Sequence, residues 1–287
     1  MGGLVFACIA PHGGLVISEI SGVEGRKALA TRRAMEELGR RMAAAQPETI
    51  VLVTPHGIPV EGAFSLLDTG RVGGELSGPG GTVAVSFQVD NALNAAIATA
   101  ARQCDVPVAR LTGRPTARPA ACLPLDWGAV VPFRFMGHTF NPPPRVVVAC
   151  PDRALPLALF PRFGQLVRHA AEQVGRRIAF IASADLGHAH DPHGPYGYDP
   201  AAAEYDAATI EAINAQDLGR MLAWDADWLE RAKTDALWQI LNLHGAIAGQ
   251  RFHGELLSYE VPTYFGMLCA AYESGSRAVG RSGSALV

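Results

Sequence analysis

Two apolar stretches of this chain end in the same tripeptide. The run at residues 4–10 is followed by Pro-His-Gly, and so, after one threonine, is the run at 50–53. Runs of this length and composition are typical of strands buried in a parallel sheet. Open α/β sheets build their sites at the carboxyl ends of such strands, so His12 and His56 are expected at that edge. Because imidazole is the commonest metal ligand, this pair predicts one shared ion.

The rest of the chain alternates strand-like and helical patterns. We expect strands at 4–10, 49–54, 145–150 and 178–183, and helices at 25–45, 91–103, 162–176, 201–213, 217–223 and 226–249. Residues 256–257 and 267–272 fit either a final strand and helix or two strands. This alternation predicts an α/β fold with a mostly parallel central sheet covered by helices on both faces.

Gly, Pro and Arg are concentrated in two segments, 68–82 and 111–126, which we interpret as loops that shape an entrance. Residues 274–287 have the composition of a disordered tail. With no linker to divide the remainder, residues 1–273 are expected to form a single catalytic domain.

Composition excludes several classes of function. The 287 residues carry a formal net charge of -3, which provides no basic surface for nucleic acid. The longest apolar runs are strand-sized, so no membrane span is expected. The first residues lack a positive region followed by a cleavable apolar segment, so no signal peptide is expected. Five scattered cysteines without a CxxC pair favour a reducing cytoplasm.

A third histidine follows a third strand. The run at 178–183 ends in small residues and leads to His188, whose position is most like those of the first two histidines. His190 and His193 fall in the Pro- and Gly-rich loop that follows, where a solvated loop is the simpler interpretation. The three histidines also have spacing compatible with a local zinc site, but the intervening Pro and Gly give no helical face for one.

Such a metal site needs a carboxylate. Two histidines and one Asp or Glu leave open positions for substrate and O₂, as in non-haem Fe(II) oxygenases. The candidates are Asp235, Glu255 and Glu260. Asp235 lies near the start of an apolar helix, where a charge favouring the helix dipole is the alternative explanation. Glu260 is the kind of acid found at a solvated strand edge. Zinc accepts the same ligand set, so a zinc hydrolase is an alternative function.

A Pro-rich segment supplies one more candidate. Asp126-Trp127-Gly128 precedes the apolar run at 130–133. Trp127 fits either the wall of a cavity or an anchor of the loop in the core.

Taken in order over residues 4–272, these landmarks resemble the class III extradiol ring-cleaving dioxygenases, typified by the beta subunit of protocatechuate 4,5-dioxygenase. His12 and His56 match the two metal histidines of that family, and Leu186-Gly187-His188 matches its catalytic histidine segment. Asp126-Trp127-Gly128 matches its Asp-His-Gly. The stretch from Asp235 to Ile247 matches its acidic helix ending in Gly-Ala.

The resemblance implies a function and a role for each residue. His12, His56 and Asp235 would hold Fe(II), and His188 would be the general acid/base. Trp127, Asp126 and His190 are expected to contact a catechol-like or aminophenol-like substrate, which is opened with O₂. A homo-oligomer or a complex with a small alpha-type subunit is expected. Two departures stand out: Asp235 replaces the usual Glu, and Trp127 replaces a pocket His, so the substrate would be held differently.

The chain also resembles the Memo proteins, which share this architecture. Their Ser-Asp-x-x-His segment matches Ser183, Asp185 and His188. This second resemblance leaves open a metal-binding protein without dioxygenase activity, or a partner subunit of the same fold.

Overall fold

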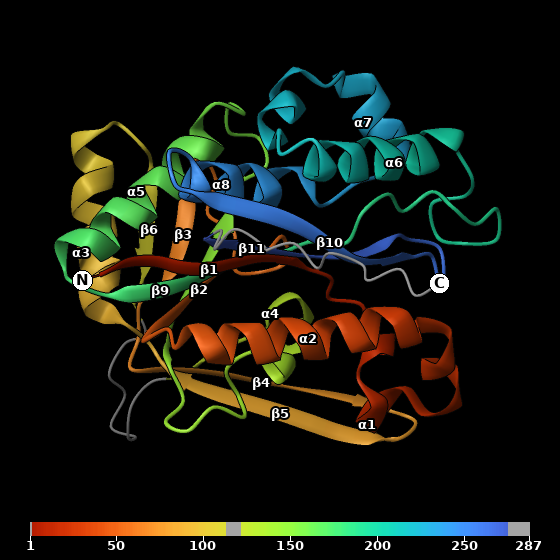
Figure 1. Cartoon of the computed structure of the whole chain (residues 1–287), viewed down its shortest axis with the longest axis horizontal. Helices are drawn as coiled ribbons and strands as arrows, with labels where there is room; N and C mark the ends of the chain where they lie inside the picture. The colour runs from red at the N-terminus through yellow and green to blue at the C-terminus, as the bar shows by residue number, and fades with distance from the viewer. Residues whose placement is uncertain (1, 113–121, 275–287) are drawn as a thin grey trace, which may run out of the picture.

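The computed structural model describes residues 2–112 and 122–274. Within these ranges, eight strands form the main sheet (Figure 1). In spatial order they are β10 (Phe252–Glu260), β11 (Met267–Ser274), β1 (Gly3–Ala10), β9 (Arg177–Ser183), β2 (Thr49–Val53), β8 (Arg145–Pro151), β3 (Phe64–Leu67) and β6 (Val108–Leu111). The four central strands, β1, β9, β2 and β8, run parallel, whereas β11 and β3 flank them antiparallel. The expected α/β fold with a mostly parallel sheet is confirmed.

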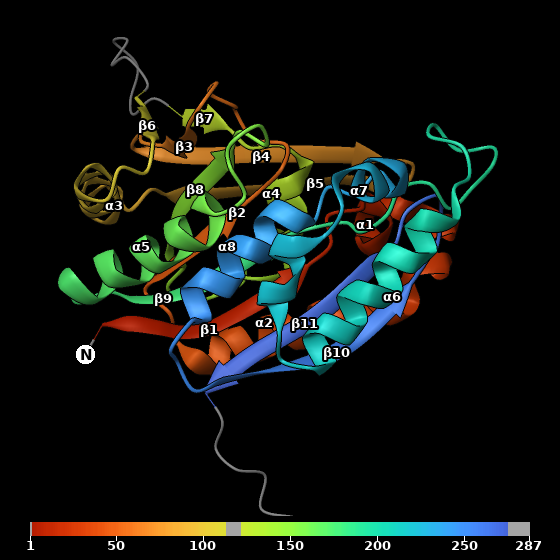
Figure 2. The same cartoon turned by 90° about the horizontal axis from the view of Figure 1, so that it is seen from above.

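Helices cover both faces of this sheet (Figures 1 and 2). One face carries α3 (Asn91–Gln103), α5 (Leu159–Gln173), α6 (Pro200–Asn214), α7 (Ala226–Ala232) and α8 (Leu237–Ile247). The other face carries α1 (Ser18–Ser21), α2 (Leu29–Ala45) and α4 (Trp127–Phe135). Short 3-10 turns η1 (Gly14–Val16), η2 (Gly22–Ala28) and η3 (Leu218–Ala223) complete the connections.

The continuous apolar runs of the central strands follow from this two-sided cover. In β1, Ala7 and Ile9 belong to the core on the α5 and α8 side, whereas Phe6 and Cys8 belong to the core on the α2 side. Successive side chains of a strand point to opposite faces, so a strand covered on both sides needs apolar residues at every position. This is why these strands were recognisable in the sequence.

The segment 68–82, expected to be a loop, is mostly a hairpin. Strands β4 (Arg71–Gly78) and β5 (Gly81–Gln88) pair antiparallel, and β7 (Cys122–Pro124) adds a third strand to this smaller sheet. The loop prediction was wrong because the glycines of this segment allow neighbouring backbone to approach the hairpin closely, rather than forming a loop. A Cβ on Gly74 would lie 2.5 Å from the carbonyl oxygen of Leu125, which no side chain tolerates. Residues 113–121 of the other expected loop lie outside the described residues.

The helix expected over 226–249 is interrupted. It divides into α7 and α8, because Lys233 adopts a left-handed conformation (φ 52°) that ends α7. The four residues 233–236 form the turn that contains Asp235. Residues 256–257 and 267–272, for which either a strand and a helix or two strands were expected, belong to two strands, β10 and β11. Ser274 closes β11, and residues 275–287 of the expected tail lie outside the described residues.

No helix in the described parts of the chain is long and apolar enough to cross a membrane.

Candidate metal centre

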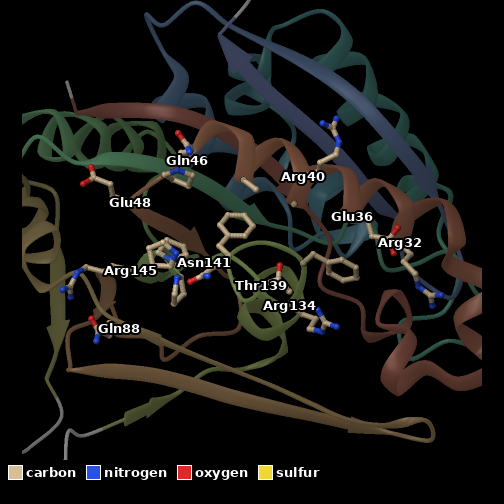
Figure 3. A pocket seen from close by; sticks show the side chains of 18 of the residues that line it. Arg32, Glu36, Arg40, Gln46, Glu48, Gln88, Arg134, Thr139, Asn141 and Arg145 are labelled. Carbon is tan, nitrogen blue, oxygen red and sulfur yellow. The ribbon is translucent and has the colours of Figure 1, made fainter.

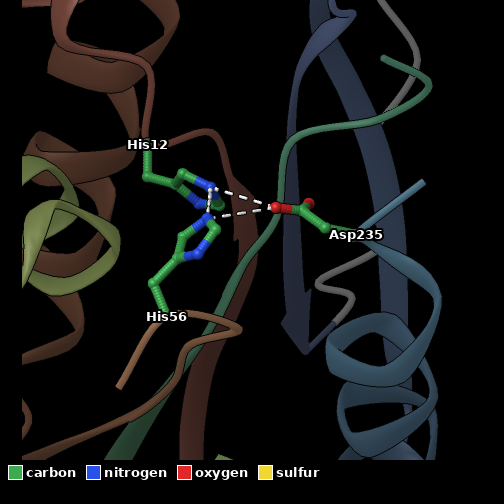
Figure 4. A group of neighbouring side chains, drawn as sticks. All are labelled: His12, His56 and Asp235. Atoms are coloured by element: carbon green, nitrogen blue, oxygen red, sulfur yellow. Dashed lines mark hydrogen bonds and ion pairs between the residues drawn. The ribbon is translucent and has the colours of Figure 1, made fainter. Parts of the chain in front are cut away.

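The parallel strands bring the predicted histidines to one edge of the sheet. Because β1, β9 and β2 are adjacent and point the same way, the residues after their carboxyl ends meet. His12 follows β1, His188 follows β9, and His56 follows β2. Asp235 enters from the turn between α7 and α8 (Figure 4).

His12 is a buried imidazole with its orientation fixed by hydrogen bonds. Its Nδ1 lies 3.0 Å from Ser183 Oγ, and Ser183 Oγ itself donates to the carbonyl of Gly128. Ser183 can therefore only accept from His12, which puts the ring proton on Nδ1 and leaves the lone pair on Nε2. The backbone N–H of His12 donates to Asp185 Oδ1 at 3.1 Å. The sequence predicted His12 but not these partners.

His56 turns its Nε2 toward the same point. The distance between His12 Nε2 and His56 Nε2 is 3.1 Å, and the two rings meet edge to face. The other face of His56 packs on Trp127, with ring centroids 4.5 Å apart. The side chain of His56 is 27% exposed, against 2% for that of His12.

Asp235 completes the cluster with its two oxygens in different roles. Oδ1 accepts a hydrogen bond from the backbone N–H of Asp185 at 3.1 Å, which fixes the carboxylate. Oδ2 points to the histidines, 3.4 Å from His12 Nε2 and 3.3 Å from His56 Nε2 (Figure 4). This buried oxygen accepts no hydrogen bond from any residue that the structure describes.

These three donor atoms fit a metal ion. Ligands on bonds of about 2.1 Å lie roughly 3.0 to 3.4 Å apart for angles between 90° and tetrahedral. The separations of 3.1, 3.3 and 3.4 Å fall in this range. The buried Oδ2 of Asp235, which accepts no hydrogen bond within the described residues, is also stabilised by a positive charge beside it. Within residues 2–112 and 122–274, His12, His56 and Asp235 form the group whose ligand atoms lie close enough together to hold one ion.

Burial and neighbouring charges shift the pKa values of His12, Asp235 and Asp185. Burial alone would lower the pKa of His12, but Asp185 and Asp235 outweigh it and raise that pKa to about 9. Burial would raise the pKa of Asp235, but His12 and His56 hold it well below its usual range. Burial dominates at Asp185 and raises its pKa to about 6, against the opposing effect of His12. A metal ion bound at His12 Nε2 would take the place of the proton that this raised pKa keeps on that nitrogen.

Asp185 is a carboxylate that sequence analysis passed over as a site residue. Its Oδ2 lies 3.3 Å from His12 Nε2, and its backbone N–H holds Asp235. It follows β9 directly, as the histidines follow β1 and β2. The rule that strand ends carry the site was therefore the signal that would have found both Asp185 and Ser183.

His188 lies beside the cluster, and one of its two ring nitrogens is engaged in a hydrogen bond. Its Nδ1 donates to the carbonyl of Leu186 at 2.8 Å, so Nε2 keeps its lone pair. Its backbone N–H donates to the carbonyl of Ala232 at 2.9 Å. The ring stacks on Phe265, with centroids 5.1 Å apart and planes 18° apart. An imidazole held in this way is suited to taking up a proton.

A cavity of about 660 Å³ opens onto the cluster. His56, Asp235 and His188 line it together, so two candidate ligands and the candidate base face one space. Its volume is typical of a site for a small organic molecule. Its apolar walls include Leu155, Leu157, Leu229, Leu237, Trp238 and Tyr196.

The other predicted residues lie in several places. Trp127 is 49% exposed and touches the site through His56. Asp126 immediately precedes α4 and has a buried Oδ1 without a partner among the described residues. His190 Nε2 donates to Asp206 Oδ2 at 2.9 Å, and His190 is not one of the residues lining the cavity. Contacts of Trp127, Asp126 and His190 with a substrate stay predictions.

The two other candidate carboxylates lie elsewhere. Glu255 pairs with Arg41 at 2.6 Å, and Glu260 accepts hydrogen bonds from the backbone and hydroxyl of Thr31. Neither is part of the cluster, so Asp235 is the candidate that the fold brings to the histidines.

Comparison with known proteins identifies the family. The model of the catalytic LigB subunit of aromatic ring-opening dioxygenase matches residues 6–268, and the chain belongs to this family. The match covers all four residues discussed above, His12, His56, His188 and Asp235.

Two individual similarities add to this. Protein CA_C1420 of Clostridium acetobutylicum is 27% identical over 255 residues, which is 88% of this chain and 54% of that protein. The chain thus spans about half the length of this relative. The crystal structure of uncharacterized protein JW3007 from Escherichia coli K12 covers 93% of this chain and 99% of its own, with a TM-score of 0.60 at 15% identity. This second likeness concerns the fold.

Proposed function

We propose that this chain is an Fe(II)-dependent extradiol dioxygenase that opens a catechol-like or aminophenol-like ring with O₂. The observation that carries the proposal is the convergence of His12 Nε2, His56 Nε2 and Asp235 Oδ2 within 3.1 to 3.4 Å in a member of this family. When bound, Fe(II) would supply a chelation site for two ring oxygens and for O₂.

The protein groups have separate tasks in this proposal. His12, His56 and Asp235 hold the ion and contribute one negative charge in total, which favours a substrate that has lost a proton. His188 takes up that proton at Nε2, because its Nδ1–H is held by Leu186. The same nitrogen can return the proton later in the reaction.

Aromatic side chains pack around the proposed base, His188. Phe265 stacks on the ring of His188, and Tyr196 and Tyr264 each lie with ring centroids 5.8 Å from it. These rings place apolar surface beside the group that transfers the proton.

The test is anaerobic loading with Fe(II), followed by oxygen uptake with catechol, protocatechuate, gallate and 2-aminophenol. We expect uptake with at least one of them and a coloured ring-opened product, and both should be lost in His188→Ala. A protein that binds the metal but consumes no oxygen with any diol or aminophenol would contradict the proposal. Such a result would favour a Memo-like metal-binding role or a zinc hydrolase.

We also propose that the protein acts in a reducing cytoplasm, as a homo-oligomer or with a small alpha-type subunit. All five cysteines are free, which suits such a compartment. Size-exclusion chromatography with light scattering measures the oligomeric state, and a strictly monomeric, fully active protein would contradict the second statement.

A further inference from the structure

Charged side chains gather at a second hollow, of about 980 Å³, which lies beside α2 (Figure 3). The arginines that line it each have an acceptor within the protein. These acceptors are carboxylates for Arg40, Arg134 and Arg176, and backbone carbonyls for Arg32 and Arg145. The cations of this hollow are therefore engaged in holding the fold.

Asp206 of α6 is a charged residue of a different kind, because it is fully buried and its contacts lead to the candidate base. Its Oδ1 accepts a hydrogen bond from the backbone N–H of Gly187 at 2.8 Å. Its Oδ2 accepts from His190 Nε2 at 2.9 Å and from the hydroxyl of Tyr259 at 2.8 Å. A carboxylate removed from water is costly unless such donors surround it. Two of these donors, Gly187 and His190, lie on either side of His188 in the chain.

A single peptide group connects Asp206 to the ring of His188. The N–H of Gly187, which donates to Asp206, belongs to the same peptide unit as the C=O of Leu186. That carbonyl accepts the hydrogen bond from His188 Nδ1 at 2.8 Å. Because a peptide unit is planar, an acceptor that fixes its N–H also fixes the direction of its C=O. Hydrogen bonds in such a chain also polarise one another, so the anion strengthens the carbonyl as an acceptor for the imidazole N–H.

The carboxylate also lies against the segment that carries Phe265, the residue whose ring stacks on the proposed base. The carbonyl of Gly266 accepts from Leu186 N–H at 2.8 Å, and the N–H of Gly266 donates to the Gly187 carbonyl at 3.1 Å. A Cβ on Gly266 would collide with Asp206 Oδ2, so this segment approaches the carboxylate as closely as glycine allows. Asp206 therefore holds the peptide that binds the imidazole and lies against the segment that packs on it.

We propose that Asp206 is a positioning residue for His188. Through the Leu186–Gly187 peptide it keeps the ring proton on Nδ1 and fixes the direction of the ring, so that Nε2 carries the lone pair. His188 acts as the base only if the proposed function holds, so this role rests on that proposal, whereas the hydrogen-bond chain does not. The alternative is that Asp206 only joins α6 to the sheet, as its hydrogen bond with Tyr259 of β10 does.

The test determines the tautomer of His188 without turnover. Protein with isotope-labelled histidine is prepared with Zn(II), a diamagnetic ion that accepts the same ligands. Long-range proton–nitrogen NMR spectra at mildly alkaline pH then show which ring nitrogen of His188 bears the proton. We expect the Nδ1–H form in the unaltered protein and a mixture of both forms in Asp206→Ala. Tyr259→Phe, the matched control, removes a different hydrogen bond of the same carboxylate and should keep the Nδ1–H form.

Turnover of the iron-loaded protein provides the second measurement. Asp206→Ala should lower kcat by about 10- to 100-fold with KM and iron content unchanged, since a misdirected base transfers the proton poorly. Tyr259→Phe should change kcat by less than about twofold, because the peptide that holds His188 keeps its acceptor. Asp206→Asn retains an oxygen for the Gly187 N–H, so it should keep the Nδ1–H form and most of kcat. Equal losses of kcat in Asp206→Ala and Tyr259→Phe would assign Asp206 to the fold alone.

The spectra separate this inference from the proposed function. A pure Nδ1–H form in Asp206→Ala, or a mixture in the unaltered protein, would overturn the positioning role even if diols are oxidised. A mixture in Asp206→Asn would do the same, which keeps the test decisive if Asp206→Ala does not fold. A tautomer change confined to Asp206→Ala would support the role even in protein that consumes no oxygen.

Discussion

His12 and His56 occupy matching tripeptides at the ends of β1 and β2, the two parallel strands on either side of β9, yet their surroundings differ. His12 is buried, and its Nδ1 is held by Ser183. His56 is 27% exposed and leans on Trp127, which is itself half-exposed. The same local sequence therefore provides one imidazole fixed by hydrogen bonds and one supported by packing.

The difference suggests that His12 and His56 contribute differently to metal binding. A ligand whose other nitrogen is fixed contributes affinity and orientation, because its tautomer and ring direction are set before the ion arrives. A ligand supported by an exposed ring can adjust as substrate enters the cavity, which His56 lines and His12 does not. The following predictions test this contrast, from the largest effect to the smallest.

Removal of His12 should have the largest effect. His12→Ala loses the fixed imidazole, so we expect more than about a hundredfold weaker metal binding and no turnover. Metal content after loading and gel filtration, measured by mass spectrometry, checks this. His169→Ala removes an exposed histidine and should retain the metal. A His12→Ala protein with full metal content would show that His12 is not a ligand.

Removal of His188 should separate turnover from metal binding. His188→Ala leaves all three candidate ligands in place, so metal content should be unchanged while kcat falls by about 10² to 10⁴. Oxygen uptake under saturating diol measures kcat. Equal loss of metal and activity would assign His188 to the ligand set instead.

The pKa of His12 predicts how pH affects the metal-free protein. Its folded-state pKa of about 9 lies above the ordinary 6.5, so the folded state binds this proton more tightly. The resulting stabilisation, roughly 3 kcal/mol, is fully present below pH 6.5 and is lost as pH rises to 9. Urea unfolding at both pH values measures this loss, and His12→Gln should reduce it. An unchanged loss in that variant would contradict the assignment.

Ser183 should matter for the fixed histidine. Ser183→Ala removes the acceptor for His12 Nδ1–H, and we expect about 10- to 100-fold weaker metal binding. Competition with a chelator of known affinity measures the change. The buried methyl group fits the same space, so an unaltered melting temperature with weaker binding would distinguish this effect from unfolding.

Trp127 should have the smallest effect on the metal. Trp127→Phe keeps an aromatic ring against His56, so metal affinity should change by less than about threefold, since packing rather than a hydrogen bond is altered. The chelator assay compares it directly with Ser183→Ala. A larger loss in Trp127→Phe than in Ser183→Ala would reverse the proposed contrast.

Much of the architecture was predictable because two-sided burial leaves a strong pattern. The strands at 145–151 and 177–183 and the helix at 91–103 were expected within one residue of their bounds. The hairpin β4–β5 was not, because glycines that allow close packing resemble those of a loop. The break between α7 and α8 was missed because a left-handed Lys233 has no signature in the sequence.

The candidate site was predictable where it depended on strand ends. His12, His56 and His188 were found by that rule, and Asp235 was one of three acids considered. Which acid reaches the histidines depends on a turn between two helices. The same rule would have indicated Ser183 and Asp185, but their contacts with His12 and Asp235 join separate elements of the fold, which spacing along the chain does not reveal.

The most direct test of the metal centre is a crystal structure of the Fe(II)-loaded protein with anomalous diffraction at the iron edge. We expect one strong peak bonded to His12 Nε2, His56 Nε2 and Asp235 Oδ2, with Asp185 outside the bonded set. A peak at another group of residues, or none at this cluster in protein shown to contain iron, would contradict the account.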